Sequence, residues 1–391
     1  MVETLITIYI LICASMIVFD CLFIAVMSLR NRAGKPRLEK SKDMIVRQLS
    51  NLLEGRPVDV SHDKKLARIL KRTVILHHFS EALDTVEKTV REGRFTPPSR
   101  DGKEQIPVQL NVGNRCFDLY LKHFASIAEA LFEKYRKKDP IVYTYYVFFL
   151  KKHDLMKHIC KPPIIAALKD FLEYGDIHVC ENVMQAIYTV GDPSLTVQAL
   201  KIVDKKEIFV HPKLVSDGLL CYSGNAAALQ SLLLDECERF SVQMQVNILN
   251  YIRFASGSHC ERIFGLLLND KTDDEVKFAC IRYFGKYKYG PAYFLLKDYA
   301  ERVDSARNEY CLISLTALRN YPGEDTVTLL KNNLRSPNWH IRFNAAESLS
   351  ALGIDYSELV DIFDGNDRFS RDILQFQLDR RYAKDKEEIY L

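Results

Sequence analysis

The chain has 391 residues, of which 48% are hydrophobic and 27% are charged, which is too apolar for a disordered protein. Its 54 Lys and Arg nearly balance its 51 Asp and Glu, which argues against a protein that coats nucleic acid. Only 16 Gly and 13 Pro are present, which disfavours turn-rich all-β folds and favours long helices.

The N-terminal segment is apolar and almost free of charge. Residues 5–29 include 21 apolar residues of 25, and their one ionisable acidic side chain is Asp20. A helix of about 20 apolar residues is long enough to cross the hydrocarbon core of a bilayer. We therefore predict a transmembrane helix over residues 4–29.

A group of cations follows the apolar segment directly. It consists of Arg30, Arg32, Lys35, Arg37, Lys40 and Lys42. A basic flank of this kind is typical of the cytoplasmic side of a span. A cleaved signal peptide would instead have basic residues before its apolar core. The pattern predicts a single-pass protein of the cell membrane, with its N-terminus outside and the bulk of the chain cytoplasmic.

Asp20 lies inside the predicted span, where an ionisable side chain costs about 2.5–3.5 kcal/mol. One interpretation is that it contacts a polar group on a partner transmembrane helix. The other is that a long apolar segment tolerates one such residue.

The region after the span is predicted to be helical. We expect a basic flank and membrane-proximal helices over 30–92, formed by segments 38–55 and 61–91. A flexible loop with a Pro-Pro pair is expected over 93–107, and degenerate helical repeats over 108–175. The apolar run 141–150 is too short to span a membrane, so we expect a buried helix there.

A period of 33 residues organises the second half of the chain. It is marked by Gly191, Gly224, Gly257, Gly290 and Gly323, and Gly353 follows after 30. Mostly small or apolar residues recur nine and five residues before these glycines, and six and nine residues after them. This pattern predicts pairs of helices over 176–391, each joined by a turn in which glycine takes the left-handed conformation.

The last repeat, residues 336–353, reads SPNWHIRFNAAESLSALG and resembles the HEAT-repeat pattern. Ile341 and Arg342 stand at the Val-Arg of that pattern, Ala345 and Ala346 at its close-packing pair, and Gly353 at its helix end. In this family the arginine usually contacts a turn aspartate, whereas this turn has Asn338.

The resemblance covers roughly 176–380 and implies an architecture, not an activity. It implies an all-α fold, a right-handed α-α superhelix (a HEAT-like solenoid), here preceded by one N-terminal transmembrane helix. Stacked repeats present an extended concave surface, which we expect the second helix of each pair to line.

No phosphate-binding loop, dinucleotide turn or hydrolase motif occurs. Histidines and cysteines are densest at His153, His158, Cys160, His178 and Cys180, but their spacing matches no structural zinc site. We therefore predict neither a metal site nor a cofactor, nor any catalytic residue, although sequence leaves a Cys-His nucleophile open. The single tryptophan, Trp339, is interpreted as a packing or capping residue.

These observations favour a non-enzymatic, membrane-tethered scaffold that binds a partner protein at or in the membrane. Two alternatives remain: an enzyme subunit like the HEAT-like lyases that attach tetrapyrroles to proteins, and a lipid-binding or trafficking module using the basic flank. DNA-repair solenoids need a strongly basic groove, so nucleic acid is not expected as a partner. No small-molecule substrate is indicated.

Overall fold

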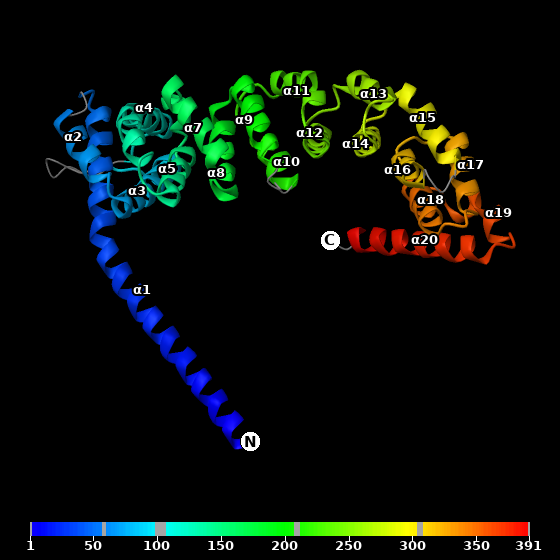
Figure 1. Ribbon diagram of the computed structural model, residues 1–391, viewed down its shortest axis with the longest axis horizontal. Coiled ribbons are helices and arrows are strands. Elements are labelled where there is room, and N and C mark those ends of the chain that lie inside the picture. The colour runs from blue at the N-terminus through cyan, green and yellow to red at the C-terminus, as the bar shows by residue number, and fades with distance from the viewer. Residues whose placement is uncertain (1, 57–59, 98–106, 207–211, 303–307, 390–391) are drawn as a thin grey trace. The chain divides into compact units, whose positions relative to one another are not determined.

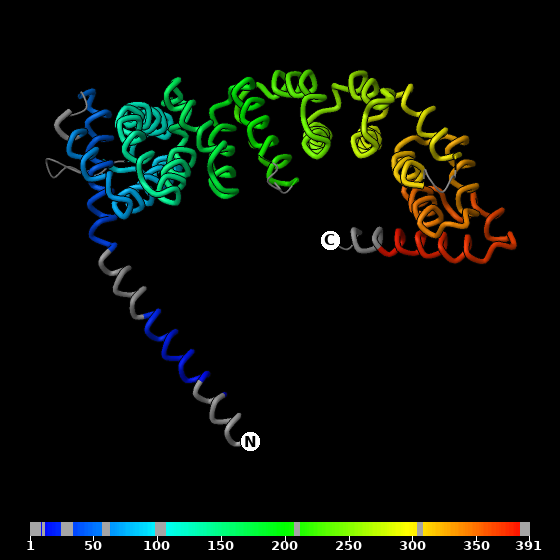
Figure 2. Tube along the Cα trace, in the orientation of Figure 1, coloured from blue at the N-terminus to red at the C-terminus, as the bar shows by residue number. Residues whose placement is uncertain are grey.

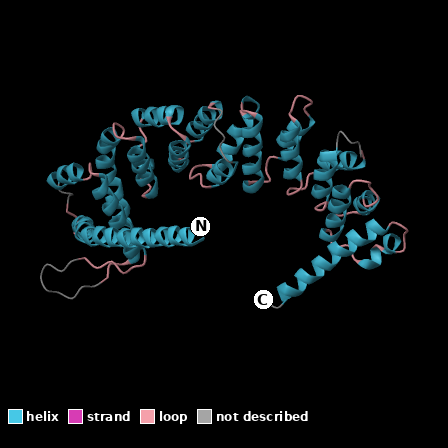
Figure 3. Cartoon of the chain, turned by 60° about the horizontal axis from the view of Figure 1, so that its bottom comes forward, coloured by secondary structure: helices cyan, strands magenta, loops and turns pink. Residues whose placement is uncertain are grey.

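A computed structural model describes residues 2–56, 60–97, 107–206, 212–302 and 308–389. Every regular element in these ranges is a helix, which confirms the predicted all-α class (Figure 3). The side chains of residues 2–8, 10–11, 25–33, 60–62 and 384–389 lie outside the description. The chain divides into two compact units, Met1–Asp192 and Pro193–Leu391.

Unit 1, Met1–Asp192, contains eight described helices (Figure 1). They are α1 (Val2–Leu53), α2 (Val60–Ile69), α3 (Thr73–Arg91), α4 (Leu110–Tyr135), α5 (Pro140–Lys152), α6 (Met156–Ile159), α7 (Pro162–Tyr174) and α8 (Ile177–Val190).

The C-terminal part of α1 packs against α3 and α4. Ile45 and Leu49 are fully buried there. Gly34 allows the close approach, because a Cβ at this position would lie 2.9 Å from the His78 ring of α3. This part of α1 therefore belongs to the core of unit 1.

The N-terminal part of α1 is different, because its described apolar side chains make no core. Large apolar residues from Tyr9 to Ile24 are exposed, and Phe19 is 68% exposed. Asp20 is exposed on the same stretch. In the part of the chain that the structure describes, no helix is both long enough and apolar enough to cross a membrane. The structure thus gives no support to the span predicted over 4–29, which stays a prediction.

The basic flank belongs to α1 and is not a separate segment. Lys35, Arg37 and Lys40 are exposed, and Lys42 is half-buried. The side chains of Arg30 and Arg32, by contrast, lie outside the described residues.

Two predicted boundaries in unit 1 are wrong and one segment is confirmed. The helix expected over 61–91 is two helices, because α2 ends before a turn at 70–72. Segment 38–55 is the end of α1 rather than a helix of its own. The run 141–150 lies in α5, as expected, but only one face of it is buried: Tyr146 is fully enclosed, whereas Ile141 is 79% exposed.

The predicted loop over 93–107 is described only at its ends, since residues 98–106 lie outside the described part. The amide of Val108 donates to the Phe95 carbonyl oxygen at 2.9 Å, and Phe95 is buried. This hydrogen bond holds the two ends of the loop together.

Unit 2, Pro193–Leu391, continues with helices only, within the residues described. Its α-helices are α9 (Pro193–Lys205), α10 (Pro212–Leu220), α11 (Ala226–Asp235), α12 (Val242–Ala255), α13 (Cys260–Leu268), α14 (Asp274–Phe284), α15 (Gly290–Glu301), α16 (Asn308–Leu318), α17 (Glu324–Asn333), α18 (Trp339–Ala351), α19 (Val360–Phe363) and α20 (Arg368–Ile389). Two short 3₁₀ helices, η1 (Cys237–Arg239) and η3 (Tyr356–Glu358), complete it.

The helices of unit 2 form two rows, as expected for stacked helix pairs. Helices α10, α12, α14, α16, α18 and α20 each pack on the next, and the chain crosses to the other row between them (Figure 2). Figure 1 shows α12, α14, α16 and α18 on the inner side of the curve of this unit. The inner row is therefore made by the first helix of each pair, so our expectation of the second helix is wrong.

Repeat columns predicted from the glycine register form much of the core. All five residues six positions after a period glycine are buried: Val197, Gln230, Ile263, Leu296 and Leu329. The column nine positions after the glycine is less regular, because in later repeats the buried residue stands one position further on. It is Leu267 in α13 and Asn333 in α17.

The period glycines stand between the paired helices, but most do not need a left-handed backbone. Gly191 and Gly353 have φ of 77° and 80°. Gly323 is extended and caps α17, and Gly290 is the first residue of α15. Gly257 is required by packing instead, because a Cβ there would lie 2.5 Å from the Tyr287 ring. The predicted left-handed turn is thus correct for two of the six glycines.

Candidate interaction groove

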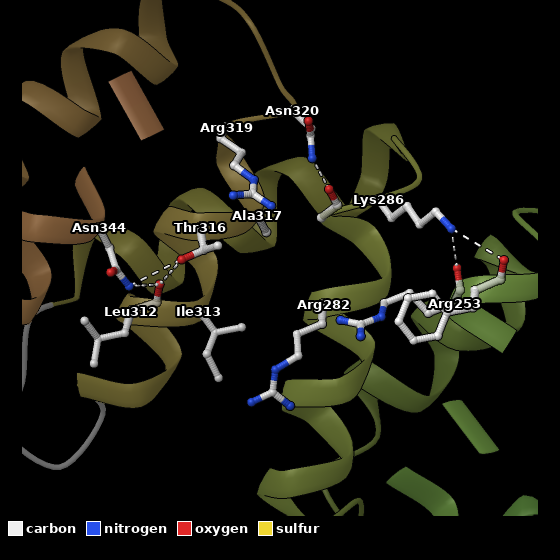
Figure 4. Close-up of a pocket in the computed structure, with 12 residues that line it drawn as sticks. Arg253, Arg282, Lys286, Leu312, Ile313, Thr316, Ala317, Arg319, Asn320 and Asn344 are labelled. Carbon is white, nitrogen blue, oxygen red and sulfur yellow. Dashed lines mark hydrogen bonds between the residues drawn. The ribbon is translucent and has the colours of Figure 1, made fainter. Parts of the chain in front are cut away.

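A groove of about 650 Å³ opens on the inner row of unit 2 (Figure 4). Helices α12, α14, α16 and α18 contribute to it, together with the residues that directly follow α14 and α16. We call it the basic groove, because four cations line it: Arg253, Arg282, Lys286 and Arg319.

Three of these cations occupy the same place in successive repeats. Arg253, Lys286 and Arg319 each stand four residues before a period glycine. Stacking of the repeats therefore brings them into one row, one cation per repeat. Arg282 lies one helical turn before Lys286, on α14, and adds a fourth positive charge beside that row.

Within the described residues, none of these four cations has a carboxylate within ion-pair distance. The cations of the other row behave differently. Arg262 contacts Asp235 at 2.6 Å, Lys297 contacts Asp325 at 3.0 Å, and Lys331 contacts Asp361 at 2.7 Å. The cations of the groove thus have no carboxylate partner, whereas these three cations of the opposite row pair with carboxylates of neighbouring repeats.

The pKa of Arg253 shows the effect of crowding cations in the groove. Partial burial and the neighbouring charge of Arg282 lower the pKa of the Arg253 guanidinium below its usual value. That guanidinium lies over the Phe254 ring, 4.8 Å from its centroid. Because Arg253 is partly buried and lies near the like charge of Arg282, an anion placed beside these two guanidinium groups would be stabilised.

Lys286 is held at the end of α12. Its ammonium donates to the carbonyl oxygens of Arg253 at 3.1 Å and Phe254 at 3.5 Å. These carbonyls belong to the C-terminal turn of α12, where a cation is favoured by the helix dipole. The contacts fix the position of the ammonium without neutralising its formal charge.

The floor of the groove is set by small residues and by amide side chains. A Cβ at Gly285 would lie 3.2 Å from the Cα of Ala317, so α14 and α16 approach closely here. Asn320 donates to the Gly285 carbonyl oxygen, and Asn344 donates to the Leu312 carbonyl oxygen at 3.1 Å. These bonds hold α14, α16 and α18 at fixed spacing.

The two ends of the groove differ in character. Figure 4 shows Arg253, Arg282 and Lys286 toward α12 and α14, and Leu312 and Ile313 toward α18. The groove can therefore hold carboxylates at one end and an apolar side chain at the other.

The helix residues on which the HEAT-like resemblance rests lie in α18, and most of them are packed in the core. Ile341, Ala345 and Ala346 are fully buried in α18. Arg342 binds Asp367, with its Nη1 atom 2.9 Å from Oδ2 and 3.1 Å from Oδ1. The aspartate missing from the turn at Asn338 is thus supplied by the turn before α20.

Asp367 directly precedes α20, and its carboxylate has several partners there. It accepts hydrogen bonds from the Ser370 hydroxyl at 2.8 Å and from the Phe369 amide at 3.0 Å. The bond from Ser370, with that from Arg342, holds the pKa of the Asp367 carboxyl below its usual value.

The His and Cys residues considered as ligands are not brought together. His153 is buried and its Nε2 lies 2.8 Å from the Ser80 hydroxyl, which links the end of α5 to α3. Burial lowers the pKa of His153 to about 4. In the part of the chain that the structure describes, no three His, Cys, Asp or Glu side chains form a group suited to a metal ion.

The Ser80–His153 pair has the composition of a nucleophile and its base, but not the access. Both side chains are 3% exposed, and Ser80 does not line the cavity of about 660 Å³ beside His153. Burial also raises the pKa of the Cys160 thiol, which keeps it protonated and poorly nucleophilic. We therefore interpret the pair as a structural link.

Trp339, which the sequence analysis interprets as a packing or capping residue, is only partly packed. It is 59% exposed and stacks on Phe343, with ring centroids 5.1 Å apart. Together with Phe369 and Phe376 it lines an aromatic groove of about 510 Å³.

The basic groove was missed from sequence, although its signal is present there. The repeats are defined by their apolar columns, whereas the cations stand in a different column, four residues before their period glycines. Arg253, Lys286 and Arg319 stand in that column in three successive repeats. Their lack of acidic neighbours is visible only in the folded chain.

No protein-family model matches this chain, and no curated protein matches its sequence.

Proposed function

We propose that this protein is a membrane-tethered adaptor, without catalytic activity of its own, whose second unit binds a partner protein through the basic groove. The observation that carries the proposal is the row of uncompensated cations on the inner face of unit 2. Buried or clustered charges without partners are costly, so a surface that retains them is suited to a complementary ligand.

The HEAT-like interpretation of residues 176–380 supports this proposal. Stacked helix pairs give an extended inner face on which several repeats contact one ligand. Unit 2 has the two rows of helices that this architecture requires.

The membrane part of the proposal rests on the sequence of residues 4–29 and on the exposure of this segment in α1. Its described apolar side chains, such as Ile17 and Phe23, face solvent around the helix. An all-round apolar helix is stable when lipid or protein covers it. The cations from Arg30 to Lys42 would then place the part of unit 1 that follows the span, and unit 2, in the cytoplasm, with Asp20 facing a partner helix.

Confinement to the membrane explains how a groove that makes few contacts can still bind its partner protein. A tether raises the effective concentration of a membrane-bound partner without any further contact. The partner in this proposal is therefore a protein at or in the same membrane.

Site-specific photo-crosslinking in membranes tests the adaptor function. A benzoyl-phenylalanine at position 313, in the basic groove, is compared with one at position 268, exposed on α13 of the other row. We expect one discrete crosslinked protein from position 313 and none from position 268. Equal crosslinking from both positions, or none from position 313, would contradict the proposal.

A further inference from the structure

The cations of the basic groove form a row with a regular spacing, and this arrangement restricts which ligands the groove can bind. Arg253, Lys286 and Arg319 follow one another at one cation per repeat. Packed helices lie about 8–10 Å apart, so neighbouring cations of this row are separated by roughly that distance at their backbone positions.

An extended peptide matches this spacing. A polyproline-type chain rises about 3.1 Å per residue and completes one turn in three residues. Every third side chain therefore points the same way, about 9 Å further along the chain. Three carboxylates at positions i, i+3 and i+6 would each meet one cation of the row.

The charge of unit 2 favours a short acidic segment over a long polyanion. Residues 193–391 contain 25 Lys and Arg against 28 Asp and Glu, so the unit as a whole is slightly acidic. Nucleic acid binding is driven by a wide positive field that meets many phosphates. In the groove, four cations that have no carboxylate partner lie together, and a few carboxylates of a ligand can reach them.

Arginine also suits carboxylates in particular, since its planar guanidinium binds both oxygens at once. Arg282 and Arg319 are exposed at the groove, and Figure 4 shows them entering it from α14 and from the end of α16. Beyond them, Leu312 and Ile313 offer a half-buried apolar surface toward α18.

We infer that the basic groove binds an extended acidic segment of a partner protein, with carboxylates three residues apart aligned on Arg253, Lys286 and Arg319. This inference rests on the proposed adaptor function and specifies the chemistry of its partner. The acidic residues lie over α12, α14 and the end of α16, and an apolar residue of the segment contacts Leu312 and Ile313.

Fluorescence anisotropy with the full chain in a neutral detergent tests the inference. The probe is a fluorescein-labelled nine-residue peptide of Pro and Ser with Glu at positions 2, 5 and 8. We expect it to bind at least tenfold more tightly than the same peptide with Gln in place of Glu. We also expect at least threefold tighter binding than a peptide with its three Glu side by side.

Charge reversal provides matched variants. Arg282→Glu with Arg319→Glu should weaken binding of the Glu peptide at least tenfold. Lys271→Glu with Arg335→Glu changes the net charge equally at exposed sites away from the groove, and should leave the affinity within twofold. The groove variant should also gain affinity for the matching Lys peptide, which shows that it is folded.

Equal binding of the Glu and Gln peptides, or equal effects of the two double variants, would overturn the inference. So would a nine-residue oligo-uridine that binds as tightly as the Glu peptide. Equal binding of the spaced and clustered Glu peptides would overturn the three-residue alignment. If crosslinking from position 313 persists in any of these cases, the adaptor function stands and only the acidic segment is wrong.

Discussion

At the residue scale, the pair formed by Arg342 and Asp367 shows what a repeat pattern leaves out. The sequence identified Arg342 from the HEAT-like helix but found Asn338 where that family has an aspartate. The structure supplies the carboxylate from a turn 25 residues further on. The pairing crosses from one repeat to the next, so no local pattern contained it.

We expect Arg342→Ala to destabilise unit 2 by about 1.5–3 kcal/mol, because a hydrogen-bonded charged partner of Asp367 is lost. The Arg342 side chain is 15% exposed, so solvent replaces it poorly. Urea unfolding followed through the fluorescence of the single tryptophan, Trp339, measures the change. Arg335→Ala, at an exposed site in the same unit, should change the stability by less than about 0.5 kcal/mol.

Asp367 also makes the stability of unit 2 depend on pH. Its pKa is lowered in the folded protein, so its contribution is present above the unfolded pKa of about 3.9 and is lost as pH falls through the folded pKa. Asp367→Asn should therefore give a shallower loss of stability between pH 5 and pH 2. Parallel acid-unfolding curves for the two proteins would contradict this assignment.

His153 makes a separate prediction for unit 1. Its pKa is lowered from 6.5 to about 4 by burial, so the unfolded chain binds the proton more readily. Stability is complete above pH 6.5 and falls by about 2 kcal/mol between pH 7 and pH 5. Hydrogen exchange of the α3 and α5 amides measures this, and His153→Gln should remove the dependence. An unchanged slope in the variant would show that another group is responsible.

At the element scale, the 33-residue period predicted the helix pairs well, because their apolar columns became the core. Ile248 and Ile281, for example, are fully buried on consecutive inner helices. The period glycines were harder to interpret, because one residue type serves three purposes. Gly353 needs a positive φ, Gly257 needs space beside Tyr287, and Gly290 begins a helix.

This difference can be measured with two alanine variants. Neither Gly353 nor Gly290 has an atom within 4 Å of the place of a Cβ, so only backbone conformation distinguishes them. Gly353→Ala should destabilise unit 2 by about 1 kcal/mol, because φ is 80°. Gly290→Ala should be neutral or stabilising by up to about 1 kcal/mol, because the alanine loses less entropy. Equal effects in urea unfolding would contradict the conformational explanation.

Other features could not be derived from sequence for physical reasons. The turn at 70–72 interrupts a continuous amphipathic pattern without a Pro or Gly, so 61–91 looked like one helix. The choice of inner row depends on how the pairs stack, which the pattern of buried residues does not determine. The basic groove depends on where carboxylates are absent in space, and sequence shows only where cations recur.

At the scale of the whole molecule, the proposal joins an apolar N-terminal helix to a binding unit. We expect Ile17→Arg with Phe23→Arg to release the full chain from membranes, since each arginine costs about 2.5–3.5 kcal/mol near the centre of a span. Carbonate extraction followed by sedimentation measures the change. Ile17→Val with Phe23→Leu should stay in the membrane pellet. Equal extraction of wild type and both variants would contradict the tether.

The central claim is that the uncompensated cations of unit 2 bind the partner protein. The most direct test is photo-crosslinking from position 313 in native membranes, with and without Arg282→Glu and Arg319→Glu. The account predicts that the crosslinked partner is lost in this variant and retained with Lys271→Glu and Arg335→Glu. Undiminished crosslinking in the folded groove variant would contradict it.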